Sequence, residues 1–413
     1  MKRSVALIGT LALNLCILSN ANVLCGAGEK PQPQLKLVKE ITLEKPMVHG
    51  ISFPNDNWKA IRINYDGLLK GEELRIFVNT GNGVLFLNSE GELIFKREFG
   101  VDEIVGLYDD GQYFLVVNRM TFDARMETKD GNTICKLKDN RFCMMSRGVL
   151  LTLDGRMILL PVDYDRPSKP RNRLQFFDKT GRLVVEGDLN ASMFQDGHNL
   201  IASLSPEGNY LGIIGSVYQK DSQAYPFRSC LFFYDAKSGK ELWHRYLPGW
   251  MIDLVQVTKA GKRIIAASSP GFLGDFRFYF YDKNGNLLQE HKIGGPPIQA
   301  VLSGDGSISA IISRKFIHLF DTETNGLIWE YREKRKEREF QSLALSYDGG
   351  TAVASLYGEE GNRYLYVFNR QGSLIISKKT PLFGLSLELT PDAKKVIIGE
   401  RGTQVNVYQL RIK

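Results

Sequence analysis

The chain has 413 residues, of which 43% are hydrophobic and 24% are charged, and its formal net charge is +7 at pH 7. These proportions are ordinary for a globular protein, and the length suits one large domain or two domains of average size. The positive charge permits contact with an anionic surface, but it is too small for this length to require nucleic acid. We therefore expect no nucleic acid among the partners.

The first 21 residues have the pattern of a secretory signal peptide. Lys2 and Arg3 form a positive n-region, an apolar run covers residues 5–18, and Ser19 and Ala21 are small residues suited to a cleavage site. The apolar run is too short for a comfortable membrane span. We expect residues 1–21 to be a cleaved signal and residues 22–34 to be a short linker; a retained N-terminal anchor is the alternative.

This pattern predicts export to the periplasm, the cell envelope or the extracellular space. No later segment is long and apolar enough to span a bilayer, so membrane association after signal removal would be peripheral. Cys25 raises the alternative of a lipoprotein. That alternative is less favoured, because Leu24 precedes Cys25 where a lipoprotein signal needs a small residue.

From about residue 150 onward the chain repeats a short turn motif, in which Ser or Thr is followed three residues later by Gly. The hydroxyl group can bond the backbone of the turn, and Gly tolerates a positive φ. Apolar runs flank the copies, which recur every 43 to 53 residues, a period typical of β-propeller blades. The motif begins at Thr152, Ser205, Thr258, Ser303 and Ser346, with a degenerate copy at Thr390.

A second turn follows an aromatic-rich strand in each repeat, and there Asp or Asn closes an Asx turn a few residues before Gly. Asp178, Asp235, Asp282 and Asp321 are examples. The segments between the turns are runs of about five to seven residues rich in Val, Ile, Leu, Phe and Tyr, which favours strands. No segment beyond the N-terminus has a sustained helical period, so few helices are expected.

Two hairpins per repeat predict a four-stranded antiparallel blade, and closing the blades into a ring removes most exposed sheet edges. We therefore predict an all-β chain with a single, monomeric β-propeller domain over residues 35–413. The last unit ends before a fourth strand, and residues 35–43 can supply that strand to close the ring. Eight blades are favoured if an irregular unit around Gly131 is one of them; seven, with that unit as an insertion, is the alternative.

The cysteines left after removal of the signal suggest little chemistry. Cys135 and Cys143 lie close in sequence and can form a disulfide in an oxidising compartment; two reduced, half-buried thiols are the alternative. Cys230 lies in a strand beside Leu231 and Phe232, which is typical of a small core residue rather than a reactive thiol.

Two hairpins carry an Asp, a turn, a Gly and then a Trp, and they end at Trp243 and Trp329. This pattern resembles the blade motif of quinoprotein-type (PQQ-like) propellers, and the turn at Ser205 resembles those of WD40-like repeats. The resemblance covers nearly the whole mature chain and implies the fold more than the function. One branch of such propellers comprises exported scaffold proteins of the cell envelope, including an outer-membrane assembly lipoprotein, and this chain resembles that branch in length and signal.

The resemblance to PQQ-like dehydrogenases would imply a quinone, Ca²⁺ and a catalytic Asp. The chain has no adjacent Cys pair to cap a quinone and only four Trp, so no cofactor is expected. The five histidines lack metal-ligand spacing, and His244 and His291 occupy matching places in two repeats, which indicates a structural role. Asp163 and Asp165 lack the further carboxylates of a dedicated Ca²⁺ loop, so no metal site is expected.

The long connections lie between the second and third strands, at residues 163–172, 218–227, 270–275 and 358–362. In a four-stranded meander they open on the same face as the links between blades, which we call the long-loop face. Rigid scaffolds carry function on such loops, and aromatic and Arg residues are enriched in interface hot spots. The candidate partner-binding residues are Tyr164, Arg166, Arg171, Tyr225, Phe227, Arg228, Trp250 and Phe272.

Residues 332–339 form the densest charge run, but its mixed signs favour a solvated loop between blades over a binding patch. The sequence therefore predicts an exported, non-enzymatic β-propeller without catalytic residues. It would bind a protein, a peptide or an envelope component through the long-loop face. The alternative is a PQQ-like dehydrogenase, or another propeller that binds a small ligand in its central channel.

Overall fold

The repeated turn motifs divide the chain into short antiparallel strands, as the sequence predicts. The structure is a computed structural model, in which residues 33–412 belong to one unit. Short 3-10 turns occur at η3 (Lys259–Gly261) and η4 (Glu359–Gly361). The residues described are 32–42, 61–63, 68–69, 71–79, 83–100, 103–108, 112–118, 123–137, 149–151, 157–159, 173–178, 182–188, 201–218, 227–248, 251–269, 276–380, 384–400 and 404–412.

The described strands form eight four-stranded antiparallel sheets, and each sheet is a simple meander. The first sheet is β2 (Ile61–Ile63), β3 (Arg75–Asn79), β4 (Gly83–Asn88) and β5 (Leu93–Glu98). The second is β6 (Glu103–Tyr108), β7 (Tyr113–Asn118), β8 (Ala124–Thr128) and β9 (Thr133–Leu137). The third is β10 (Val149–Leu151), β11 (Met157–Leu159), β12 (Arg173–Phe177) and β13 (Leu183–Asp188). The fourth is β14 (Ile201–Leu204), β15 (Tyr210–Tyr218), β16 (Phe227–Asp235) and β17 (Glu241–Tyr246).

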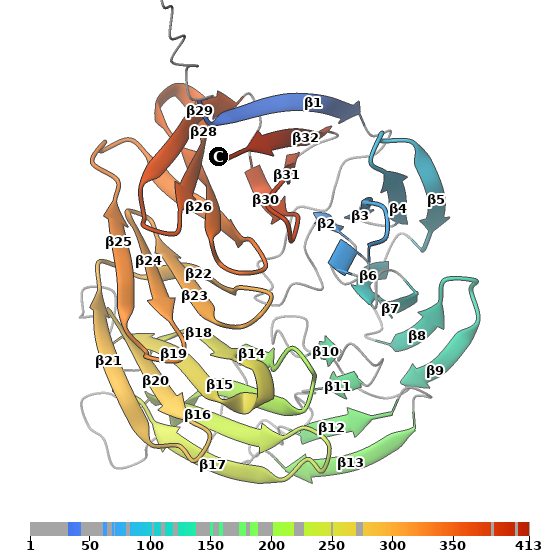
Figure 1. Cartoon of the computed structure of the whole chain (residues 1–413). Helices are drawn as coiled ribbons and strands as arrows, with labels where there is room; N and C mark the ends of the chain where they lie inside the picture. Colours follow the sequence, from blue (N-terminus) through green and yellow to red (C-terminus); the bar gives the residue numbers. More distant parts are fainter. Residues whose placement is uncertain are drawn as a thin grey trace, which may run out of the picture. The chain divides into compact units, whose positions relative to one another are not determined.

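The remaining sheets follow in chain order (Figure 1). The fifth is β18 (Met251–Val257), β19 (Arg263–Ser269), β20 (Phe276–Asp282) and β21 (Leu287–Ile293). The sixth is β22 (Pro297–Leu302), β23 (Ile308–Ser313), β24 (Phe316–Asp321) and β25 (Leu327–Arg332). The seventh is β26 (Glu339–Leu345), β27 (Thr351–Tyr357), β28 (Arg363–Asn369) and β29 (Leu374–Thr380). The last is β30 (Gly384–Leu389), β31 (Lys395–Glu400), β32 (Gln404–Arg411) and β1 (Gln34–Thr42).

This arrangement confirms an all-β propeller of four-stranded antiparallel blades. The irregular unit around Gly131 contributes the β8–β9 hairpin of a four-stranded sheet. Cys135 belongs to β9, but its side chain and Cys143 lie outside the description, and their pairing stays a prediction. Cys230 is fully buried with a free thiol, and burial raises its pKa to about 12, which confirms an inert core residue.

The ring is closed by the N-terminal strand, as predicted. β1 pairs antiparallel with β32, from Gln34 opposite Arg411 to Thr42 opposite Gln404 (Figure 1). Ile41 is buried and packs with apolar residues of the first sheet, so β1 also joins the first sheet to the last. The predicted signal at residues 1–21 lies outside the described residues and stays a prediction.

The turn face, opposite the long-loop face, uses its polar groups internally. Buried Ser303 accepts a hydrogen bond from the Ile308 backbone N–H at 2.9 Å, and Ser346 accepts one from the Thr351 N–H at 2.9 Å. Asp348 accepts bonds from the Gly350 N–H and the Ser346 hydroxyl, and these two bonds hold the pKa of its carboxyl below the usual value. The repeated turn motif therefore closes hairpins.

Neighbouring sheets are joined near this face by the two tryptophans of the PQQ-like motif. Trp243 donates its indole N–H to the Lys283 carbonyl at 2.8 Å, and Trp329 donates to the Arg370 carbonyl at 3.1 Å. A Cβ added to Gly372, which has φ +77°, would lie 2.6 Å from Trp329 Cγ. The glycine of one turn therefore makes room for the tryptophan of the preceding sheet.

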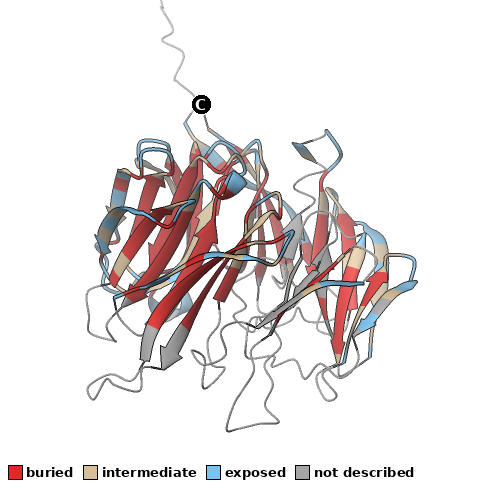
Figure 2. Cartoon of the chain, turned by 90° about the horizontal axis from the view of Figure 1, so that it is seen from below, coloured by how far each residue is buried: buried red, intermediate tan, exposed pale blue. Residues whose placement is uncertain are grey.

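All eight outermost strands in the described part of the chain have a β-bulge at an aliphatic residue. These bulged residues are Val38, Ile94, Ile134, Val184, Leu242, Leu288, Ile328 and Ile375. A bulge bends and twists an edge strand and interrupts its hydrogen-bonding pattern, which hinders pairing with another chain. Buried residues lie along the strands, and exposed residues lie mainly on the turns and the outermost strands (Figure 2).

Candidate partner-binding surface

The long connections lie where the sequence places them. Each joins the second strand of a sheet to the third: β11 to β12, β15 to β16, β19 to β20, and β27 to β28. In a meander these connections and the links between sheets lie at the same ends of the strands. The long-loop face is therefore correctly assigned by topology.

The predicted residues themselves fall largely outside the description. Phe227 and Arg228 begin β16, opposite Tyr218 and Val217, but their side chains are not described. They remain hypotheses together with the other candidates. Outside the described residues lie Tyr164, Arg166, Arg171, Tyr225, Trp250 and Phe272, as well as Asp163 and Asp165.

On the same face, the described part of the chain contains the loop of residues 333–338 between β25 and β26, which we call the charged loop. It links two sheets, as predicted, but it is held in place at both ends. The Glu333 backbone N–H donates to the Lys315 carbonyl at 2.8 Å, and the Phe340 N–H donates to the Arg314 carbonyl at 2.9 Å. The tight β23–β24 turn at residues 314 and 315 therefore supports the charged loop.

The Lys315 side chain fixes the backbone of the charged loop. Its ammonium group lies 3.3, 2.5 and 2.6 Å from the carbonyl oxygens of Arg335, Lys336 and Arg338. An ammonium group has three N–H donors, so this set of acceptors uses its full capacity. Lys315 is thus a positioning residue whose donors are already engaged.

Two arginines of the loop converge on a buried tyrosine of the next sheet. Arg338 Nη1 donates to the Tyr366 hydroxyl at 2.6 Å, and Arg335 Nη1 donates to the same oxygen at 3.1 Å. Arg338 also lies over the Tyr364 ring, with 3.4 Å between its guanidinium carbon and the ring centroid. Burial raises the pKa of Tyr366, so its hydroxyl stays protonated and neutral.

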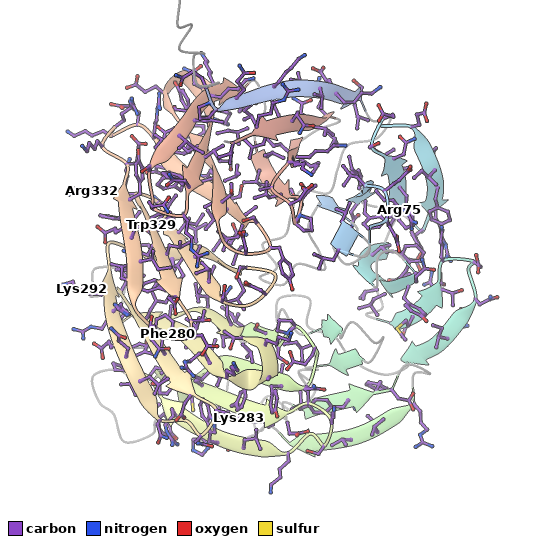
Figure 3. The ribbon with its side chains drawn as sticks, viewed as in Figure 1. Arg75, Phe280, Lys283, Lys292, Trp329 and Arg332 are labelled. Atoms are coloured by element: carbon purple, nitrogen blue, oxygen red, sulfur yellow. The ribbon has the colours of Figure 1, made fainter. Side chains whose placement is uncertain are left out.

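The exposed charges of this region are mainly positive. Glu333 is buried, and its carboxylate accepts a hydrogen bond from the Arg335 backbone N–H at 2.9 Å. Glu337 is exposed. The exposed cations are Arg314, Arg332, Lys334, Arg335 and Lys336, and we call them the cationic surface (Figure 3 labels Arg332).

The sequence did not single out this surface, because the run at residues 332–339 mixes positive and negative charges. Which charges are used internally depends on Lys315 and Tyr366, which lie in other strands or turns. The sequence did offer one hint of this surface. Tyr364 and Tyr366 lie at the start of β28, and aromatic rings are common partners of Arg.

We expect Lys315→Met to destabilise the protein by about 1–3 kcal/mol, because three carbonyls lose a charged donor. Denaturant unfolding would measure the loss, and hydrogen exchange of residues 333–338 should accelerate. Lys334→Met is the matched control, because it removes an exposed charge from the same loop. Equal stability and exchange in the two variants would contradict the positioning role.

The described histidines act in packing. His291 Nε2 lies 2.9 Å from the Asn325 carbonyl oxygen, and His244 Nδ1 lies 2.7 Å from a Glu241 carboxylate oxygen. Both rings also contact phenylalanines, which agrees with the structural role predicted for them. Across the described ranges, no group of three or more His, Cys, Asp and Glu side chains is placed to hold a metal ion.

Within the described residues, none of the helices has the length and apolar character needed to cross a bilayer.

No protein-family model matches the sequence, and no curated protein matches it. Among solved structures, the chain is similar to the C-terminal WD40 domain of Sif2, with 13% identity, 92% of this chain and 99% of that chain covered, and a TM-score of 0.56. It is also similar to a eukaryotic initiation factor (11% identity, 92% and 96% covered, TM-score 0.58) and to BamB from Moraxella catarrhalis (13% identity, 91% and 100% covered, TM-score 0.53). At these identities the likeness concerns the fold: the chain is a β-propeller similar to the WD40 and BamB propellers.

Proposed function

We propose that this chain is an exported, non-enzymatic β-propeller that binds a protein or peptide partner of the cell envelope through its long-loop face. The WD40 and BamB propellers that share its fold favour an interaction module over an enzyme. Export is supported by the signal pattern at residues 1–21.

The two faces differ in how their polar groups are used, and this difference carries the proposal. On the turn face, Asp235 accepts hydrogen bonds from the Lys237 and Ser238 backbone N–H groups at 2.9 and 2.8 Å. Asp282 and Asp321 close their turns in the same way. The long-loop face instead carries connections of unequal length and the cationic surface, and such variable loops on a rigid scaffold are where binding residues concentrate.

The test replaces Tyr225, Phe227 and Arg228 by Ala and captures partners by crosslinking in the native envelope. We expect capture to fall about tenfold, because aromatic and Arg residues dominate interface energies. The matched control replaces Lys237, Ser238 and Lys240 by Ala at the opposite end of the same β-sheet, on the turn face.

The two triple variants should fold equally well, as judged by circular dichroism. Equal capture by both would reject this placement of the site. Recovery of the wild-type protein from the cytoplasm with residues 1–21 still attached would reject export.

A further inference from the structure

We propose that the cationic surface binds an acidic segment of a polypeptide partner, with Arg335 as the central contact. This inference rests on the proposed function, because it specifies the chemistry of a partner on the same face. The surface consists of the five exposed cations Arg314, Arg332, Lys334, Arg335 and Lys336, which come from one turn, one strand end and one loop.

The charge balance at this place favours a negative ligand. Burial of the Glu333 side chain, which is 1% exposed, leaves Glu337 as the exposed carboxylate within the charged loop. Close complementary charges strengthen association and raise its rate. A ligand with several carboxylates therefore fits this surface better than a neutral ligand.

The surface is also organised before any ligand binds. Three carbonyls of the charged loop are fixed by Lys315, and the Arg335 guanidinium donates to Tyr366 through Nη1. Arg335 Nη1 also lies 3.6 Å from a carboxylate oxygen of buried Glu333, but the Arg335 side chain is still 57% exposed, so the rest of its guanidinium can donate to a carboxylate of a ligand. A fixed guanidinium loses less conformational freedom on binding and can form a two-point contact with a carboxylate.

The neighbouring exposed side chains favour a polypeptide over a membrane surface. Ile298 is 44% exposed at the start of β22, and Tyr357 is 39% exposed at the end of β27. Both strand ends lie on the long-loop face of the two sheets that the charged loop joins. An apolar contact beside a cationic centre suits a peptide with mixed side chains, whereas the exposed residues of the charged loop are all charged and offer no apolar group for insertion into lipid.

The test measures binding of a fluorescein-labelled oligoglutamate peptide to the full mature chain by fluorescence anisotropy. The double variant Arg335→Glu with Lys336→Glu should bind about tenfold more weakly than wild type, and the difference should shrink at high salt. The control, Lys237→Glu with Lys240→Glu, makes the same change in net charge on the turn face and should bind like wild type. Equal weakening by both double variants would overturn the proposal, because binding would then follow net charge alone.

Tyr366→Phe tests the organisation of the surface without changing its charge. Loss of the hydroxyl that accepts from both arginines should weaken oligoglutamate binding by about threefold, because Arg335 must then be ordered on binding. Unchanged affinity would overturn the central role of Arg335.

Vesicles of phosphatidylglycerol and phosphatidylcholine separate the peptide from a lipid surface. Binding of these vesicles through Arg335 and Lys336, without binding of oligoglutamate, would overturn the proposal in favour of a membrane. The peptide assay needs no native partner. It can therefore fail while envelope capture succeeds, which would reject the acidic segment and leave the proposed function standing.

Discussion

Replacing Trp329 by Ala is expected to destabilise the propeller by about 3–5 kcal/mol, the range for truncating a buried Trp. The side chain is 8% exposed, stacks near the Phe368 ring and fills the space above Gly372 of the next sheet (Figure 3 labels Trp329). The substitution also leaves the Arg370 carbonyl without the indole donor that lies 3.1 Å away. The denaturation midpoint should fall, and hydrogen exchange in β28 and β29 should accelerate.

Leu327→Ala is the control for this experiment. Leu327 lies on the same strand but is 45% exposed, so its truncation should change stability by less than about 0.5 kcal/mol. Trp329→Phe should fall between the two variants, because a ring still covers Gly372 while the hydrogen bond is lost. If Trp329→Ala were no more destabilising than Leu327→Ala, Trp329 would not join the sheets.

His318 should make the stability of the protein depend on pH. Its side chain is 2% exposed between the rings of Phe316 and Phe320. Burial, and secondarily the charge of His291 on the neighbouring sheet, lower its pKa to about 4. Glu330 is close, with 2.9 Å between His318 Nε2 and a carboxylate oxygen, but the geometry is not that of a hydrogen bond.

The direction of this pH effect follows from the pKa values of His318 in the unfolded and the folded chain. The unfolded chain binds the proton near the ordinary value of 6.5, whereas the folded chain binds it only near 4. The contribution of neutral His318 is therefore complete above pH 6.5 and is lost as the pH falls toward 4, by about 3 kcal/mol in total. Urea unfolding at several pH values would measure this loss.

His318→Phe should remove that part of the pH dependence while keeping an aromatic side chain in the site. Carboxylates titrate in both proteins, so the informative quantity is the difference between the two profiles. Glu330→Gln should keep this pH dependence or strengthen it, because a carboxylate 2.9 Å from the ring nitrogen favours the protonated form, whereas burial opposes it. Loss of the pH dependence in Glu330→Gln, or identical profiles for wild type and His318→Phe, would contradict the assignment.

Much of the fold could be predicted because its information is local. The hydroxyl of Ser303 and the carboxylate of Asp282 bond backbone groups within five residues, and these bonds form the same turns in repeat after repeat. The missing fourth strand in the last repeat also indicated that the N-terminal segment pairs with it, and β1 does pair with β32. Recognising periodic turns and counting strands in a sequence requires no knowledge of distant contacts.

From the sequence, only the face that carries the candidate surface could be predicted, and not the residues that form the surface. Strand order alone places the second-to-third connections and the links between sheets at one end of the meander. The sequence cannot show which charges of the loop at residues 333–338 remain available, because their partners lie elsewhere in the chain. Arg335 and Arg338 reach Tyr366 from about 30 residues away, a separation that no local pattern encodes.

Local sequence patterns were therefore enough to predict the propeller class, its N-terminal closure and the face that carries long loops, since hydrophobic alternation and turn chemistry act over a few residues. The folded arrangement was needed to see that the motif tryptophans join neighbouring sheets, that every described outermost strand is bulged, and that Glu333 is buried while Arg335 stays exposed. These features depend on which side chains of separate sheets pack together. Burial then distinguishes charges that are used inside the fold from charges that remain free to meet a partner.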